Sequence, residues 1–157
     1  MSTAIEIRGI APEKTLETCA QQIIVGYFHE MMSHKSGASD GTDIEFVHDM
    51  RVASRRLRAA MGNFADCFEN EPFKKYYKQI RTITQTMGTV RDLDVLIVHF
   101  QNELKTLSVL EQNDVKGLIE HLQQKCEEAR KPMLELFTEL DASDFEKQFL
   151  TFFEADE

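Results

Sequence analysis

The segment VHDMRVASRRLRA, residues 47–59, places one histidine and four arginines on a helical apolar pattern. At 100° per residue, Val47, Met50 and Leu57 share one side of this segment, and the same side continues after the segment with Met61, Phe64 and Phe68. A stripe borders that side, spans about 80° and about 15 Å, and consists of His48, Arg51, Arg55 and Arg58. Arg56 lies off the stripe, where we expect it to be solvated. The segment predicts a helix with one side in a core and a row of cations along the core's edge.

The charge of the chain changes sign around this segment. The 157 residues carry a net charge of -9, but residues 46–91 hold 9 basic and 4 acidic side chains. Residues 1–45 carry -4 and residues 92–157 carry -10. The acidic total argues against a surface that coats polyanions in general. The basic middle favours a localised anion site.

Composition predicts one helical domain. Glycine and proline are few, at 7 and 3, and 42% of the residues are hydrophobic. We expect residues 1–12 to form a flexible N-terminal segment. Neither a signal peptide nor a membrane-spanning run is recognisable, and Cys19, Cys67 and Cys126 form no CxxC pair. A cytoplasmic protein with free thiols and no cofactor is the expectation.

The apolar pattern predicts an all-α, up-and-down bundle of about five to six helices. The first starts near Pro12 and reaches Met31, and residues 33–43 form a polar loop. Thr42 and Glu45 have capping-box spacing for a helix over about 43–69. A third helix starts at Pro72 and ends or bends at Gly88. A fourth starts at about residue 91, with Asp92 and Asp94 in its first turn. A fifth runs from near Asn113 to about residue 140 with a kink at Pro132, and a short helix with Ser143 and Glu146 at capping-box spacing follows it. Residues 5–10 offer the one weak strand pattern.

A second basic stripe lies on the helix that begins at Pro72. Lys74, Lys78 and Arg81 share one side of it, and its core side carries Phe73, Tyr76, Ile80, Ile83 and Met87. Helices joined by a short connection are usually antiparallel neighbours. Both stripes then emerge on the same side as a groove, which Arg91 closes at one end. Arginine suits such a groove because its planar fork donates two hydrogen bonds to a phosphate. A structural ion-pair network, in which Asp92 or Asp94 anchors an arginine, is the alternative.

Two linked motifs resemble those of a known family. VHDMRVASRRLRAAMGNF (47–64) and MGTVRDLDVL (87–96) are similar to the CHAD family, the conserved-histidine α-helical domain. The resemblance covers about residues 13–155. It implies a helical fold with a basic surface that binds inorganic polyphosphate without catalysis, and a triphosphate-tunnel (CYTH-type) protein as a possible partner. The matching positions are His48, Arg51, Arg55, Arg56, Arg58, Arg91, Asp92 and Asp94.

The resemblance also bears on assembly. Family domains are about twice this length and contain two helical bundles, whereas this chain carries one motif pair. The chain is therefore similar to one half of that architecture. Either it pairs with a second copy of itself, or it is a half-size or shortened member of the family. A homodimer is the expectation, through an apolar patch for which the candidates are Phe145, Phe149, Phe152 and Phe153.

Other functions fit parts of the pattern. HDMRVAS (48–54) has the spacing of a histidine phosphotransfer domain, but Val52 stands where such domains usually have glycine. Glu45 and His48 form a single E-x-x-H, too little for a carboxylate-bridged metal bundle, and the arginines would repel a cation. The pattern disfavours nucleic acid as a ligand, since the segment has no exposed aromatic platform for bases. A protein-interaction bundle without a ligand is the remaining alternative.

Overall fold

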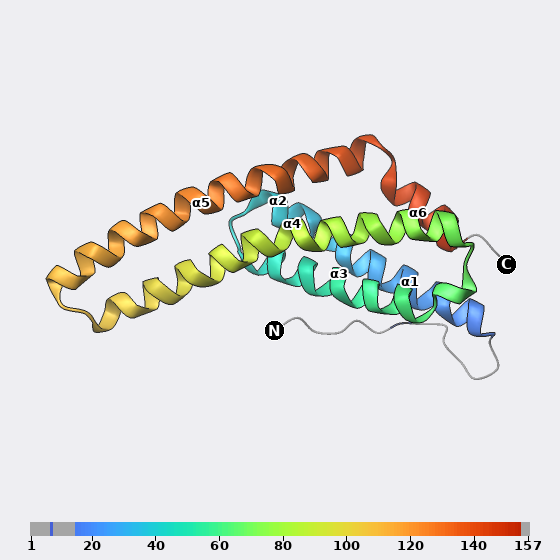
Figure 1. Ribbon diagram of the computed structural model, residues 1–157, viewed down its shortest axis with the longest axis horizontal. Helices are drawn as coiled ribbons and strands as arrows, with labels where there is room; N and C mark the ends of the chain where they lie inside the picture. The colour runs from blue at the N-terminus through green and yellow to red at the C-terminus, as the bar shows by residue number, and fades with distance from the viewer. Residues whose placement is uncertain (1–6, 8–14, 155–157) are drawn as a thin grey trace.

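A computed structural model describes residue 7 and residues 15–154, and these contain helices and no strand. The elements are α1 (Leu16–Ser33), α2 (Lys35–Asp40), α3 (Glu45–Asn63), η1 (Ala65–Cys67), α4 (Asn70–Glu103), η2 (Leu104–Thr106), α5 (Val109–Ala142) and α6 (Phe145–Phe153). In Figure 1 the four long helices α1, α3, α4 and α5 alternate in direction. The predicted all-α, up-and-down bundle is confirmed. Pro12 and the residues of the weak strand pattern other than residue 7 lie outside the described residues.

The division into helices differs from the prediction in the middle of the chain. The helix that begins before Pro72 does not end at Gly88 but continues to Glu103 as α4. Asp92 and Asp94 therefore lie inside a helix and not in a first turn. A glycine inside a helix costs only about 1 kcal/mol relative to alanine. The packing of α4 against both α3 and α5 offsets that cost.

The predicted loop over residues 33–43 contains the short helix α2. Arg130 of α5 donates hydrogen bonds to the carbonyl oxygens of Ala38 and Ser39, at 3.0 and 3.1 Å. These bonds satisfy carbonyl groups that the end of a helix leaves unpaired. Gly41 follows with φ 77°, in the left-handed region that favours glycine. A distant arginine therefore stabilises a helix that residues 33–43 alone do not indicate.

The helix ends also differ from the predicted caps. Neither the Thr42–Glu45 nor the Ser143–Glu146 box forms, since the residues at the N-caps of α3 and α6 are Ile44 and Asp144. A capping box does form at the start of α5, between Ser108 and Glu111. That helix consequently begins before Asn113. It also passes through Pro132 without interruption.

Helix α6 closes one end of the bundle with aromatic side chains. Phe145, Phe149 and Phe153 are buried, and Phe152 is partly buried. The Phe149 ring stacks on Phe28 of α1, with 4.0 Å between ring centroids and 9° between ring planes. The prediction that these four phenylalanines form an exposed patch for dimerisation is wrong. A nine-residue helix can bury them because α1 and α4 surround it with aromatic partners.

Helices α4 and α5 extend well beyond the rest of the bundle. Each has 34 residues, whereas α1 has 18 and α3 has 19. Their far halves form a two-helix hairpin that projects from the bundle (Figure 1). We call residues 92–125 the arm. The bundle proper consists of α1, α3, α6 and the remaining parts of α4 and α5.

Replacing Phe149 by alanine should lower the free energy of unfolding by about 3–5 kcal/mol, because it opens a cavity beside Phe28. Chemical denaturation followed by circular dichroism measures the change. Phe152→Ala is the matched control and should cost clearly less, since Phe152 is only partly buried. Equal losses at the two positions would contradict the packing of α6 described above.

Candidate functional site

The seam between α3 and α4 brings the sequence-predicted cations together. Its centre is a buried hydrogen bond of 2.8 Å between the hydroxyl groups of Ser54 and Thr84. Towards the start of α3, the guanidinium of Arg51 lies over Gly88, where a Cβ atom would be 3.4 Å from Arg51 Nε. Towards its end, the guanidinium carbon of Arg58 lies 5.8 Å from the centroid of the Tyr77 ring. The arginine stripe of α3 therefore runs along α4, as predicted from helical spacing.

The second stripe lies on the same seam. The two helices are antiparallel, and the contacts from Ser54 to Thr84 and from Arg58 to Tyr77 place Arg81 level with Arg55. Arg91 lies at the other end, with its Nη1 atom 3.9 Å from Glu45 Oε1. We call the whole set the basic face: His48, Arg51, Arg55, Arg58, Lys74, Lys78, Arg81 and Arg91.

Most cations of the basic face lack an acidic partner. Within residues 15–154, only Lys74 and Arg91 of this set form ion pairs, with Glu71 and Glu45 at 3.9 Å each. The Nε atoms of Arg51 and Arg58 are buried and have no hydrogen-bond partner among the described residues. Asp92 is exposed and anchors no arginine in the part of the chain that the structure describes. A structural ion-pair network therefore does not account for the basic face.

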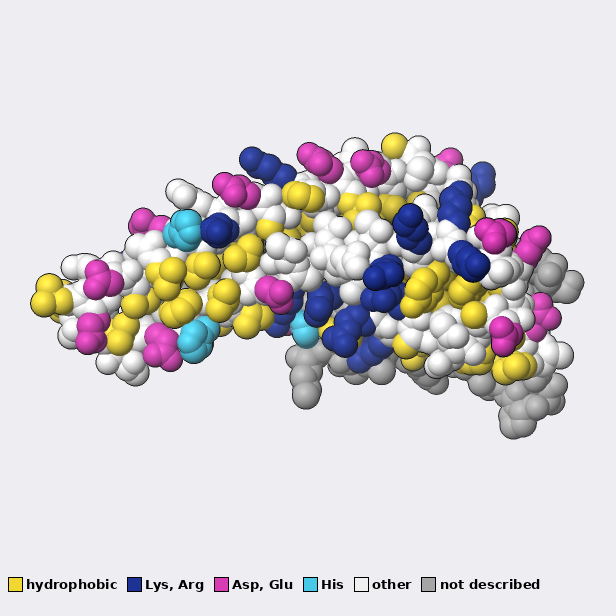
Figure 2. Space-filling view, viewed as in Figure 1, with side chains coloured by type: hydrophobic (Ala, Val, Ile, Leu, Met, Phe, Trp, Pro, Cys, Tyr) yellow, Lys and Arg dark blue, Asp and Glu magenta, His cyan; other side chains and the backbone are white. Residues whose placement is uncertain are grey.

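The surface view shows that basic and acidic side chains lie on different parts of the molecule. In Figure 2 lysine and arginine side chains gather over α3 and the adjoining part of α4, whereas acidic side chains lie mostly on the arm and at the opposite end. Arg55, Lys78 and Arg81 are exposed, and Arg51, Arg58 and His48 are half-buried. The half-buried side chains are held by packing, and the exposed ones are free to reach a ligand.

Arg56 has a structural role that its sequence position did not reveal. We predicted that it is solvated, but Arg56 Nη1 lies 3.7 Å from Glu30 Oε1 of α1. The Glu30 side chain is only 5% exposed. Burial raises the pKa of Glu30, and the positive charge of Arg56 partly opposes that rise. Arg56 therefore compensates a carboxylate on the side of α3 away from the basic face.

Arg56→Ala should lower the free energy of unfolding by about 1–3 kcal/mol, because it leaves a buried acceptor without its partner. Thermal unfolding at neutral pH measures the loss. Adding Glu30→Gln to Arg56→Ala should recover most of it, since no buried charge remains. A double variant no more stable than Arg56→Ala would argue against this pairing.

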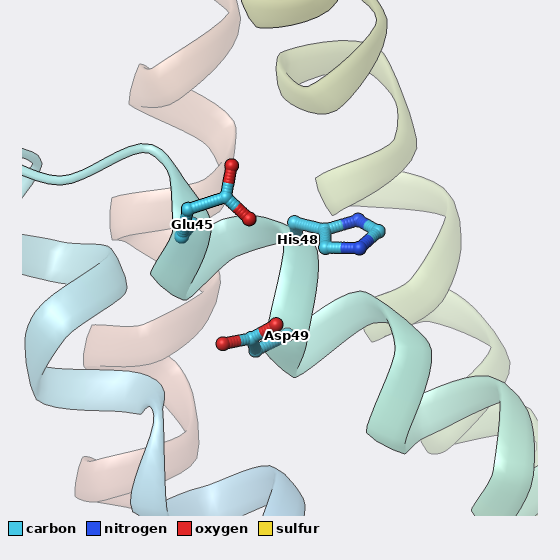
Figure 3. Close-up of side chains that lie close together, drawn as sticks. All are labelled: Glu45, His48 and Asp49. Atoms are coloured by element: carbon cyan, nitrogen blue, oxygen red, sulfur yellow. The ribbon is translucent and has the colours of Figure 1, made fainter. Parts of the chain in front are cut away.

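The start of α3 brings three titratable side chains together. The potential ligand atoms of Glu45, His48 and Asp49 all lie within 4.8 Å of one another. In Figure 3 the ring of His48 points towards α4, and the two carboxylates lie on its other side. Arg91 is already paired with Glu45, and the positive end of the helix dipole is nearby. The charge of Arg91 and the helix dipole both disfavour a bound cation, so we assign no metal to this cluster. Its two carboxylates, Glu45 and Asp49, mark where the basic face ends.

A buried pair lies between α4 and α5, close to Arg91. The Cys126 thiol donates to Asp94 Oδ1 at 3.4 Å. Burial raises the pKa of the Asp94 carboxyl, although the Cys126 hydrogen bond and the charges of Arg130 and Arg91 oppose the rise. Burial, assisted by Asp94, raises the pKa of Cys126 to about 12. Asp94 therefore holds α4 to α5 from inside the protein and takes no direct part in the basic face.

Asp94→Asn should stabilise the protein at neutral pH, because asparagine keeps the acceptor for Cys126 and removes a charge that burial disfavours. The raised pKa means that the folded state binds this proton more tightly than the unfolded state. Below pH 3.8, the ordinary pKa of this carboxyl, Asp94 is protonated in both states and its ionisation costs no stability. Above the folded-state pKa it is ionised in both states, and the full cost is present. The gain should shrink as the pH falls towards 3.8. Unfolding midpoints of the original protein and of Asp94→Asn across that pH range test the prediction. Asp92→Asn, at an exposed position, is the control. A stability gain from Asp94→Asn that does not change with pH would contradict the prediction.

Two contributors to this region were missed from the sequence. Tyr77 lies under Arg58, but its spacing indicates only a residue at the edge of the core. Gly88 leaves room for Arg51 to cross α4, whereas the sequence pattern indicates only that the helix ends or bends there. Neither role has a local signal, because each depends on which residue of the other helix lies opposite.

Comparison with known protein families gives a match that covers most of the chain. The family model of the CHAD domain matches residues 22–157, nearly the whole chain. No curated protein and no solved structure matches. None of the helices in the described residues combines the length and the apolar composition needed to cross a membrane.

Proposed function

The chain belongs to the CHAD domain family, and on that basis we propose that its basic face binds inorganic polyphosphate or a closely related phosphate polyanion without hydrolysing it. The observation that carries this proposal is the row of cations along the α3–α4 seam, most of which have no acidic partner within residues 15–154. A buried polar atom normally has a hydrogen-bond partner. The Nε atoms of Arg51 and Arg58 have none within the described residues, and the other N–H donors of these guanidinium groups can serve an anionic ligand.

The chemistry of the face favours a phosphate chain. Guanidinium groups bind phosphate oxygens with paired, charge-assisted hydrogen bonds. Arg51, Arg55 and Arg58 recur along about 10 Å of helix, which suits a ligand that repeats its charge along its length. Arg81 and Lys78 supply a second row from α4. A small anion would need only one or two of these groups.

The proposed absence of catalysis also rests on the residues of the face. It consists of cations and one histidine, with no hydroxyl or thiol nucleophile among its members. Ser54 and Thr84 are close by, but they are buried and bonded to one another. Apart from His48, the face thus supplies binding groups and no group suited to attack a phosphoanhydride.

Arg55→Ala should weaken polyphosphate binding by about ten- to a hundredfold, because a hydrogen bond to a charged group contributes about 1.5–3 kcal/mol. Lys78→Ala should weaken it several-fold, and Lys131→Ala, an exposed lysine of α5 away from the face, should leave it unchanged. Titration calorimetry with long-chain polyphosphate at two salt concentrations measures this. Affinity should fall steeply with salt through counterion release.

Three controls make that measurement decisive. Equal losses at Lys78 and Lys131 would show that overall charge and not the basic face binds the anion. Single-stranded DNA of matched charge should bind more weakly, and tighter binding of DNA would overturn the choice of ligand. Release of inorganic phosphate by the pure protein would overturn the non-catalytic assignment.

The phosphotransfer alternative is less well supported by the surroundings of His48. Glu45 and Asp49 lie beside its ring and would repel a phosphoryl group. A radioactive phosphorelay assay with a response regulator distinguishes the two functions. A CYTH-type partner stays a prediction from the family resemblance.

A further inference from the structure

Exposed apolar side chains concentrate on the arm. Of the nine large hydrophobic residues exposed within the described residues, six belong to it: Val95, Leu96, Val98, Val109, Leu110 and Leu118. Figure 2 shows hydrophobic side chains across both helices of the arm, on the same side of the molecule as the basic face. Soluble proteins rarely leave such a patch without a partner.

One side of the arm carries two of these exposed residues, Leu96 and Leu118, beside the partly buried Leu93, Phe100 and Val115. Leu93, Leu96 and Phe100 repeat at the i, i+3, i+7 spacing of one side of α4, and Val115 and Leu118 share one side of α5. Leu96 is 43% exposed and Leu118 is 39% exposed, although both lie in regular helix. Two helices cannot enclose these side chains, because enclosing a core requires further helices. We call these five residues the arm patch.

We propose that the arm patch is covered by the arm patch of a second copy of this chain, in an antiparallel arrangement about a twofold axis. Each arm supplies two helices, so two arms form a four-helix bundle. A twofold axis makes a patch face itself, and an apolar patch is complementary to its own copy. The proposal is independent of polyphosphate binding.

The charges that flank the arm patch fit this arrangement. Lys125 follows Leu118 by seven residues and Glu103 follows Leu96 by seven, so both lie on the patch side of their helices. Both are exposed. Lys125 is near the base of the arm, and Glu103 is near its tip. An antiparallel twofold arrangement therefore sets Lys125 of each copy beside Glu103 of the other.

The size of the arm predicts a weak dimer. It is about 20 Å long, and its helices are about 8–10 Å apart, so each copy offers a face of roughly 400 Å² in projection. Specific interfaces usually bury about 600 Å² or more of accessible surface per partner. A corrugated face has more accessible surface than its projection, which brings the arm close to that limit. Reversible association at micromolar concentration is the expected consequence.

Sedimentation equilibrium of the full chain, without polyphosphate, tests the proposal from low to high micromolar concentration. We expect a monomer–dimer equilibrium that Leu96→Glu and Leu118→Glu each weaken at least tenfold. Leu134→Glu is the matched control, because Leu134 is a similarly exposed leucine of α5 outside the arm. Circular dichroism verifies that each variant is folded. A monomer at every concentration, or an equal loss with Leu134→Glu, would overturn the proposal.

Charge exchange tests the antiparallel orientation. Glu103→Lys and Lys125→Glu should each weaken the dimer several-fold, since each places like charges together across the interface. The double variant should return to the original affinity, because it restores both pairs with their signs reversed. A double variant weaker than either single variant would exclude this orientation.

Discussion

The packing of α3 against α4 is the constraint on which the other features of this protein depend. The hydroxyl groups of Ser54 and Thr84 are hydrogen-bonded to one another at the centre of the seam, so both can be buried where the helices meet. With that contact fixed, the apolar side of each helix must enter the core. The arginines beside those apolar positions are then left at the edge, over the neighbouring helix. The basic face is therefore a consequence of how the core packs.

Neighbouring residues of α3 have different roles for the same reason. Arg55 and Arg56 are adjacent in sequence but point about 100° apart around the helix. Arg55 is exposed on the seam, whereas Arg56 turns towards α1 and meets a buried carboxylate. Two arginines of one motif thus have different surroundings: Arg55 is exposed on the seam, and Arg56 lies beside the buried carboxylate of Glu30. A motif written as a row of arginines conceals this difference.

The unequal lengths of the helices create a second surface. Where α1 and α3 cover them, α4 and α5 contribute to a closed core. Beyond the start of α3 the same two helices continue without cover, and their apolar residues become exposed. Helix α4 therefore presents cations on the bundle, and α4 and α5 together present apolar side chains on the arm. The buried Asp94–Cys126 contact lies near the transition between these parts and joins the two helices there.

The sequence by itself determined the helical class, the alternating bundle and the positions of the cations on α3. These depend on spacing within one helix, which the order of apolar residues reveals. Only the tertiary structure decided what each residue meets: Arg130 at the end of α2, Glu30 beside Arg56, and aromatic partners around α6. It also decided that Gly88 lies inside a helix, because packing on both sides of α4 outweighs the local cost of glycine. Such contacts join residues far apart in the chain, and local spacing carries no record of them.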